Sequence, residues 1–194
     1  MAFSIFFSLH PLVSTDYQNY VEANSRIRFF KAGEWIKLPG ESKSAAYFVA
    51  KGLLETYIID SDNRKKIIDF TWEKQVCAST TATYFSNPPE EYIQCSEDTT
   101  IIQFSMDAVV QIITKYPEGL MFYKKTLKQM NKKNLTHIRL MQIEGKPDRL
   151  QQFQNAFKKY LSRLSTAQQA SYLCINRSTF FTAQKIILKR NKRG

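Results

Sequence analysis

The residues best suited to chemistry in this sequence are basic and hydroxyl side chains near its C-terminal end. A guanidinium group can donate two parallel hydrogen bonds to a guanine edge, and lysine ammonium groups neutralise phosphates. Hydroxyl groups and helix N-termini also bind phosphate oxygens. The pattern is typical of nucleic-acid recognition, and the predicted contact residues are Ser165, Thr166, Asn176, Arg177, Ser178, Thr182, Lys185, Lys189 and Arg190.

Two short helices joined by a tight turn would position these side chains. The first is predicted to open at the capping box Ser165-Thr166-Ala167-Gln168, and the second to follow Asn176 and run to about residue 188. This is a helix-turn-helix pattern in which Arg177, at the start of the second helix, enters the major groove first. The alternative is that Arg177 only contacts phosphate or caps its own helix. Few residues follow the second helix, so we expect a winged-helix-like domain with a truncated wing.

Charge separates the two parts of the chain. Residues 120–194 contain 17 Lys and Arg against 2 Asp and Glu, whereas residues 1–119 contain 11 against 15. A basic module joined to a mildly acidic one is typical of a phosphate-binding domain beside a sensing domain. Double-stranded DNA is therefore the predicted partner of the basic part, and the alternative is a merely soluble basic surface.

The part before residue 119 has the pattern of a β-domain. Runs of β-branched and aromatic residues alternate with Gly, Pro, Asn and Asp, which predicts an antiparallel barrel or sandwich. Residues 1–25 are predicted to form helices that pack against it. With the helices that follow, the fold class is α+β, and the predicted strands are 47–50, 53–59, 66–70, 92–95 and 99–104.

A long helix with a heptad seam is predicted after Gly119. Its lysines fall on the outer faces, and a single Asn at an a position fixes register in a two-stranded coil, so we expect a homodimer. The alternative is a surface helix packed on its own barrel. The predicted seam consists of Leu120, Tyr123, Leu127, Met130, Asn134, His137 and Met141. A hinge at residues 145–148 then gives three domains, 1–118, 119–145 and 146–194.

Several classes of function are excluded by what the sequence lacks. The two histidines, His10 and His137, form no metal-ligand cluster, and no nucleophile elbow, phosphate-binding loop or dinucleotide fingerprint occurs. The three scattered cysteines have no metal-binding spacing. We therefore expect neither an enzyme nor a metal or other cofactor. The apolar stretches are too short to span a membrane, and the N-terminus does not have the pattern of a leader, which predicts a cytoplasmic protein.

Two ordered sets of residues give the sequence a resemblance to the Crp/Fnr family of bacterial regulators. The first set lies in the β-domain and includes Phe30, Gly33, Pro39-Gly40-Glu41, Tyr47-Phe48-Val49, Gly52 and Ile67-Ile68-Asp69-Phe70. The second is the stretch 170–179, which is similar to the family's A-x-x-L-G-I-x-x-x-T helix-turn-helix core. The resemblance implies a jelly-roll barrel of the cyclic-nucleotide-binding type, a long dimerisation helix and a DNA-binding helix-turn-helix. It also implies RNA polymerase as a further partner.

Departures from the family pattern bear on regulation. Members that bind cyclic nucleotides use a Gly-Glu pair and an Arg for the phosphate, whereas residues 75–84 contain neither and no arginine occurs between Arg64 and Arg139. Residues 1–76 also lack the cysteines of iron–sulfur members. We therefore expect no response to cyclic AMP and leave the effector unassigned. Phe181 and Cys174 replace small residues of the family pattern, which keeps open an alternative function: a non-catalytic sensor or protein-interaction module without specific DNA binding.

Overall fold

The computed structural model describes residues 1–10, 13–41, 45–78 and 91–191. The chain divides into two compact units. One comprises residues 1–58 and 69–129, and the other residues 59–68 and 130–194. Within the described ranges, every helix is too short or too polar to cross a membrane.

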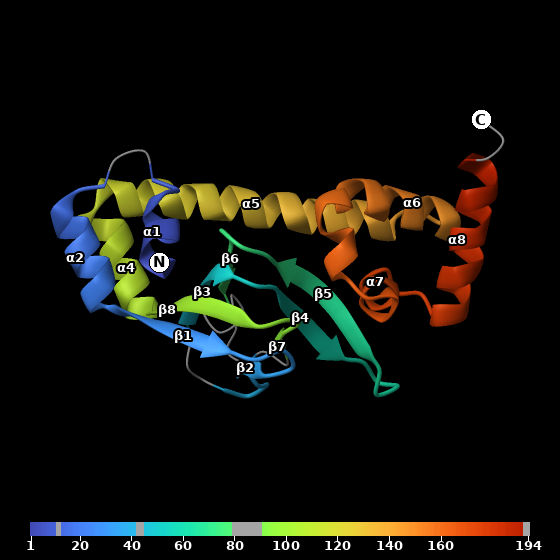
Figure 1. Ribbon diagram of the computed structural model, residues 1–194, viewed down its shortest axis with the longest axis horizontal. Helices are drawn as coiled ribbons and strands as arrows, with labels where there is room; N and C mark the ends of the chain where they lie inside the picture. Colours follow the sequence, from blue (N-terminus) through green and yellow to red (C-terminus); the bar gives the residue numbers. More distant parts are fainter. Residues whose placement is uncertain (11–12, 42–44, 79–90, 192–194) are drawn as a thin grey trace. The chain divides into compact units, whose positions relative to one another are not determined.

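The described part of the chain contains eight strands in two sheets (Figure 1), and most of their residues belong to the N-terminal unit. One sheet has the order β1-β8-β3-β6 and the other β2-β7-β4-β5. Of the two predicted forms, barrel or sandwich, the described strands take the second, because they form two separate four-stranded sheets that do not close into a barrel. The strands are β1 (Ser25–Phe30), β2 (Trp35–Lys37), β3 (Ala45–Lys51), β4 (Leu54–Ile59), β5 (Lys65–Thr71), β6 (Val76–Ala78), β7 (Tyr92–Cys95) and β8 (Thr99–Ser105).

Five of the eight described strands form close to where the sequence predicts them. β7 has the predicted limits, and β3, β4, β5 and β8 differ from prediction by one or two residues at an end. β8 pairs with both β1 and β3, so its two neighbours satisfy both of its edges. This central position explains why Ile101 and Ile102, which point to opposite faces, are both fully buried.

Two helices at the N-terminus cover one sheet. α1 (Ala2–Phe7) packs on β3 and β8, and α2 (Thr15–Ala23) lies against β1 and adds Tyr17 and Val21 to the same apolar cluster, so both helices cover the sheet as the sequence predicts. Phe6 is the centre of this contact, because the centroid of its ring lies 5.0 Å from that of Phe48 and 5.6 Å from that of Phe104. The helix α4 (Met106–Lys115) follows β8 and begins at Ser105, whose hydroxyl accepts the Ala108 amide.

Gly52 makes the tight connection between β3 and β4. Its φ of +104° is unfavourable for any residue with a side chain, and a Cβ there would lie 2.8 Å from the Cα of Thr99. The glycine of the family pattern is thus required both by backbone conformation and by the close approach of β8.

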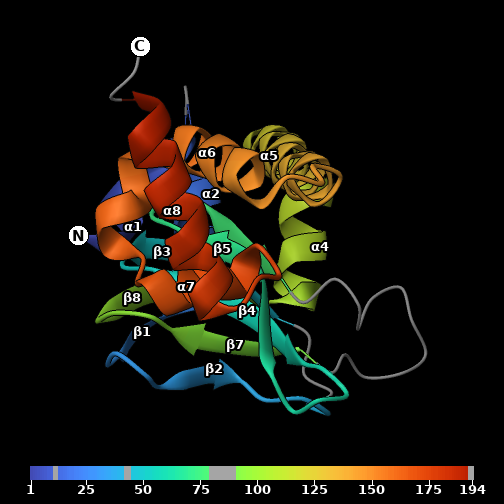
Figure 2. The same cartoon turned by 90° about the vertical axis from the view of Figure 1, so that its right-hand side faces the viewer.

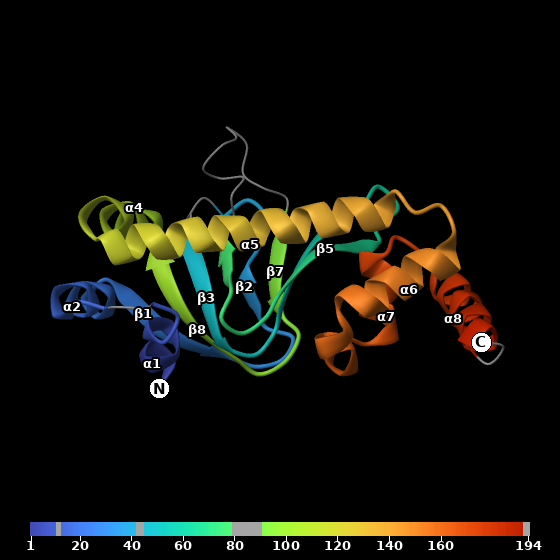
Figure 3. The same cartoon turned by 90° about the horizontal axis from the view of Figure 1, so that it is seen from above.

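The long helix α5 (Pro117–Met141) runs through both units of the chain (Figure 1). The C-terminal unit holds its last part together with α6 (Lys146–Ala156), the short 3-10 helix η1 (Lys158–Arg163), α7 (Thr166–Tyr172) and α8 (Arg177–Asn191). Figure 3 shows these shorter helices gathered after α5. The helical stretch before α7 is divided, because α6 ends at Ala156 and η1 follows it.

An aromatic core holds the C-terminal unit together. Tyr172 is buried, and its ring lies 4.6 Å from His137 and 5.5 Å from both Phe153 and Phe157. Phe180 and other apolar side chains of α8 are buried in the same unit. The helices α7 and α8 are therefore stabilised by packing in this core, because helices this short are not stable in isolation.

Candidate nucleic-acid interface

One face of α8 is exposed and basic. Its opposite face buries Phe180, Ala183 and Ile187, which recur at helical spacing. Figure 2 shows α8 crossing α7 within the C-terminal unit. The exposed side chains within one arc of the helix form what we name the basic face of α8, and they are Arg177, Ser178, Phe181, Thr182, Lys185, Leu188 and Lys189.

Arg177 projects from the first turn of α8. Its guanidinium lies 5.8 Å from the centre of the Phe181 ring, a distance at which a cation and an aromatic face attract each other. Both side chains are exposed. Phe181 was absent from the predicted contacts, although its position one turn after Arg177 places it on the same face.

The start of α8 is fixed by Asn176. Its Oδ1 accepts the Thr179 amide at 2.7 Å and the Ser178 hydroxyl at 2.8 Å. This is an N-cap, which occupies the acceptor oxygen of Asn176 and orients Ser178 toward it. Two of the predicted contact residues are thus engaged in ordering the helix end that carries Arg177.

Both ends of α7 have specific caps. Ser165 and Gln168 form the predicted capping box. The backbone N–H of Gln168 donates to the Ser165 hydroxyl at 3.2 Å, and the backbone N–H of Ser165 donates to the Gln168 side-chain oxygen at 2.8 Å. At the other end, the amides of Cys174 and Ile175 return to the carbonyls of Ser171 and Ala170, which is a Schellman motif. Cys174 has a φ of +53°, so a residue with a side chain stands where glycine is usual.

Arg190 pairs with Asp148 of α6. Its guanidinium lies 2.5 Å from the carboxylate. Both side chains are more than half exposed, so this pair contributes little to stability. Since the pair engages Arg190 at the far end of α8, Lys185 and Lys189 are the more accessible cations of the helix among the predicted phosphate contacts.

Arg149 links the end of α5 to the end of α7. Its side chain is only 7% exposed and donates four hydrogen bonds to backbone carbonyls. Two go to Ile143, one to Met141 and one to Leu173, at 2.7 to 3.2 Å. The guanidinium thereby satisfies carbonyls that helix termini leave unpaired. Sequence reasoning missed this role, because backbone acceptors leave no signature in the sequence.

The predicted seam of α5 divides into two sets. Leu120, Leu127 and Asn134 are exposed, and Ile138 lies on the same side of the helix at 53% exposure. The remaining four are partly buried, and one of them, His137, packs on Tyr172. The partly buried residues are Tyr123, Met130, His137 and Met141. The exposed apolar stripe is therefore rotated around α5 relative to the predicted heptad seam.

The interior of the N-terminal unit contains polar groups. Lys37 lies opposite Ile93, which lies opposite Thr56, so the three side chains share one face of their sheet. The Thr56 hydroxyl is 3.7 Å from the Cys77 thiol of the other sheet, which shows that this face points inward. Lys37 is 2% exposed, and its burial lowers the pKa of its ammonium group.

The described residues contain no cluster of His, Cys, Asp or Glu that could hold a metal ion. Most of the stretch 75–84, on which the expectation about cyclic AMP depends, lies outside the described residues, as do Lys192 and Arg193.

Comparison with known proteins identifies the N-terminal part. Residues 27–116, from β1 through α4, match the family model of the cyclic nucleotide-binding domain. No curated protein matches the sequence.

Solved structures extend the likeness to most of the chain. A CooA mutant from Carboxydothermus hydrogenoformans is 16% identical with a TM-score of 0.72, covering 91% of this chain and 82% of that one. FixK2 from Bradyrhizobium japonicum is 15% identical with a TM-score of 0.69, covering 86% of each. The c-di-GMP responsive global regulator CLP from Xanthomonas campestris is 13% identical with a TM-score of 0.73, covering 92% and 93%. Residues 27–116 thus match the cyclic nucleotide-binding domain, and most of the chain has the fold of CooA, FixK2 and CLP.

Proposed function

We propose that this chain is a homodimeric, DNA-binding transcription regulator of the Crp/Fnr type that works in the cytoplasm. The basic face of α8 is the observation that carries the proposal. In this reading α7 and α8 form the helix-turn-helix, and α8 lies in the major groove with Arg177 at its leading end. The fold shared with CooA, FixK2 and CLP supports the same assignment.

The residues of the basic face have separate roles in the proposal. Arg177 contacts a guanine, because its fork matches the O6 and N7 acceptors. Lys185 and Lys189 lie two and three turns further along, where the helix passes the phosphate backbone. Ser165 and Thr166 present the N-terminus of α7 to a phosphate. Thr182, on the same face, contacts the groove beside Arg177.

Dimerisation uses the exposed stripe of α5. Leu120, Leu127 and Ile138 lie on one side of the helix, and the exposed Asn131 and Asn134 lie between them. In a parallel pair each asparagine meets its own counterpart, which fixes the register of the two helices. The two recognition helices are then held at the spacing of two half-sites.

In this proposal the regulator does not respond to cyclic AMP. An arginine is the side chain suited to bidentate contact with a cyclic phosphate, and none occurs between Arg64 and Arg139. The buried ammonium of Lys37 does not replace such a fork, because it offers a single charge centre. The effector remains unassigned, and contact with RNA polymerase is the expected route to transcription.

A non-catalytic sensor or protein-interaction module is the second candidate. The exposed Phe181 favours it, because an aromatic ring on the surface of a basic helix also suits contact with a protein. This candidate predicts no preference among duplex sequences.

Two alanine variants test the base-reading role of Arg177. A preferred site is first selected from a random duplex pool. Arg177→Ala is then expected to cost about 1–3 kcal/mol on that site and little on a scrambled duplex. Lys189→Ala is expected to weaken both duplexes alike and to make the slope of log affinity against log salt shallower by about two, because the dimer loses one phosphate contact from each protomer.

Lys115→Ala, an exposed lysine of α4, is the charge-matched control. Equal losses on the two duplexes for Arg177→Ala would assign Arg177 to phosphate contact instead.

A further inference from the structure

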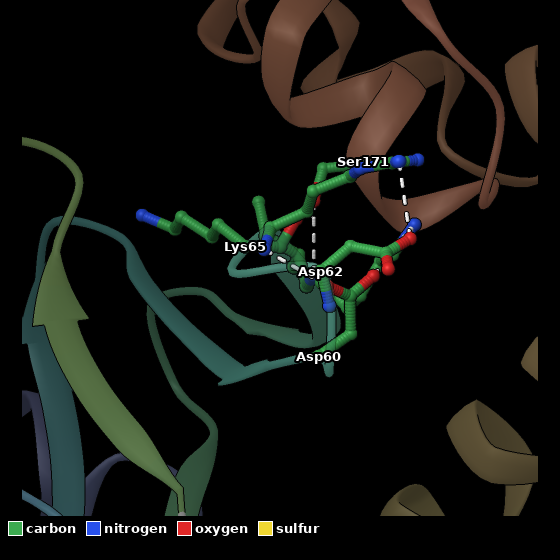
Figure 4. A network of polar contacts seen from close by, with 7 residues as sticks. Asp60, Asp62, Lys65 and Ser171 are labelled. Carbon is green, nitrogen blue, oxygen red and sulfur yellow. Dashed lines mark hydrogen bonds and ion pairs between the residues drawn. The ribbon is translucent and has the colours of Figure 1, made fainter.

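The hairpin between β4 and β5 contacts α7 inside the C-terminal unit. The Ser171 hydroxyl donates to the Lys65 carbonyl at 2.7 Å and accepts the Ile67 amide at 3.0 Å (Figure 4). Figure 4 shows Ser171 reaching from its helix toward the edge of the hairpin. Residues 59–68 therefore belong to the same compact unit as the helix pair.

The geometry of this contact requires a hydroxyl group. β5 is the edge strand of its sheet, so alternate amides and carbonyls of the strand have no partner within the sheet. The Lys65 carbonyl and the Ile67 amide are the pair that a parallel strand would use around Lys66. A single atom that both donates and accepts satisfies the two groups, and a serine Oγ has this property.

The hairpin has an ordered turn that provides a fixed base for this contact. The Asp60 carboxylate accepts the amides of Asp62 and Arg64 at 3.0 and 2.8 Å. These hydrogen bonds hold the pKa of Asp60 below its usual value, and Lys66 lies 3.5 Å from the same carboxylate. Asn63 takes a left-handed φ of +57°, a conformation that asparagine tolerates better than most residues. The turn beside the edge that Ser171 contacts is thus held by interactions within the hairpin itself.

Ser171 also lies at the turn of the proposed helix-turn-helix. Its own carbonyl accepts the Cys174 amide in the Schellman motif, and Arg149 holds the next part of the turn through the Leu173 carbonyl. The residue is therefore held on one side by the hairpin and on the other by the turn that leads into α8. The basic face of α8 itself stays exposed, so the hairpin does not cover it.

We propose that the β4–β5 hairpin fixes the orientation of the DNA-reading helix pair α7–α8, with Ser171 as the positioning residue. We name this contact of Ser171 with Lys65 and Ile67 the seat. The proposal rests on the proposed function, and it adds a second support to the link that Arg149 makes with α5. A seated pair presents both recognition helices of a dimer in one orientation, so less conformational entropy is lost when two half-sites are bound at once.

Hydrogen exchange of the full-length protein without DNA tests the seat directly. Ser171→Ala is expected to speed exchange of the Ile67 amide at least tenfold, and also that of Ile175 in the turn. Ser171→Thr keeps the hydroxyl and should restore both. Ser162→Ala, which removes an exposed hydroxyl of η1, is the matched control and should change neither. Unchanged exchange at Ile67 or Ile175 in Ser171→Ala overturns the seat.

A second variant approaches the seat from the hairpin. Asp60→Ala removes the acceptor that orders the turn, and it is expected to speed exchange of Ile67 and Ile175 in the same direction without changing α7. If Asp60→Ala speeds exchange only within the hairpin, the turn does not support the helix and the seat is overturned.

Affinity for the selected duplex separates the seat from the proposed function. Ser171→Ala should bind that duplex about five- to tenfold more weakly, with a smaller loss on a scrambled duplex, and Ser171→Thr should bind like the parent protein. Faster exchange with unchanged duplex affinity would overturn the positioning role. A parent protein that binds no duplex overturns the proposed function, whereas the exchange results still decide whether the hairpin seats the helix pair.

Discussion

The double substitution Leu127→Lys and Ile138→Lys is expected to leave the protein monomeric. Leu127 is 40% and Ile138 53% exposed on the same side of α5, so neither substitution disturbs the core of the protomer. Two lysines on each helix would bring like charges together in a parallel pair and remove its central apolar contacts. Sedimentation velocity measures the result.

The same variant should lose at least a hundredfold in affinity for a duplex with two half-sites, because the second recognition helix is no longer linked to the first. The added lysines raise the positive charge of the protein, which by itself strengthens DNA binding, so a loss of affinity cannot be attributed to charge. Val110→Lys, at an exposed apolar position of α4, is the control and should remain dimeric. A double variant that sediments as the parent dimer would show that the stripe is not the interface.

Arg149→Met is expected to destabilise the C-terminal unit by about 3 kcal/mol. The substitution removes four hydrogen bonds and leaves buried carbonyls of α5, α7 and the linker without a donor, which costs about 1–3 kcal/mol for each group. Relief from burying the charge offsets part of this loss. Arg149→Lys should be intermediate, because an ammonium group cannot reach three carbonyls in the fixed directions of a guanidinium.

Urea unfolding can assign the effect of Arg149→Met to one unit. Both tryptophans, Trp35 and Trp72, lie in the N-terminal unit, whereas most of the helices that Arg149 connects lie in the other. The transition in far-ultraviolet circular dichroism should therefore move to lower urea, ahead of tryptophan fluorescence. Lys146→Met removes the same charge from an exposed position of α6 and should leave the transition in place. A parent-like transition for Arg149→Met would mean that the carbonyls find other donors.

The elements that sequence patterns predict well are those fixed by local interactions. The capping box at Ser165 and Gln168 is a contact between near neighbours, so its residue types alone indicate it. The five strands β3, β4, β5, β7 and β8 contain runs of β-branched and aromatic residues, which predict their ends to within two residues. β2 and β6 have only three residues each, too few to establish a period of two.

Contacts between distant segments account for what the sequence could not predict. The heptad on α5 counts His137 as a seam residue, but the ring packs on Tyr172, which lies on another helix. Ser171 and Arg149 contact backbone atoms 104 and 24 residues away, and backbone acceptors are the same in every residue. The basic face of α8 was predictable because its residues share one helix, whereas its two anchors depend on the tertiary fold.

The central claim, that the chain binds duplex DNA through α8, is tested most directly by the salt dependence of binding. Lys185 and Lys189 of each protomer would together neutralise about four phosphates in a dimer, so log affinity should fall with log salt at a slope of about −3.6. The slope should become shallower by about two when Lys189→Ala is introduced in both protomers. Fluorescence anisotropy with a labelled duplex from the selected pool gives the affinity at each salt concentration. Binding whose affinity does not change with salt, or the absence of binding at low salt, would contradict the proposal and favour a protein-interaction module.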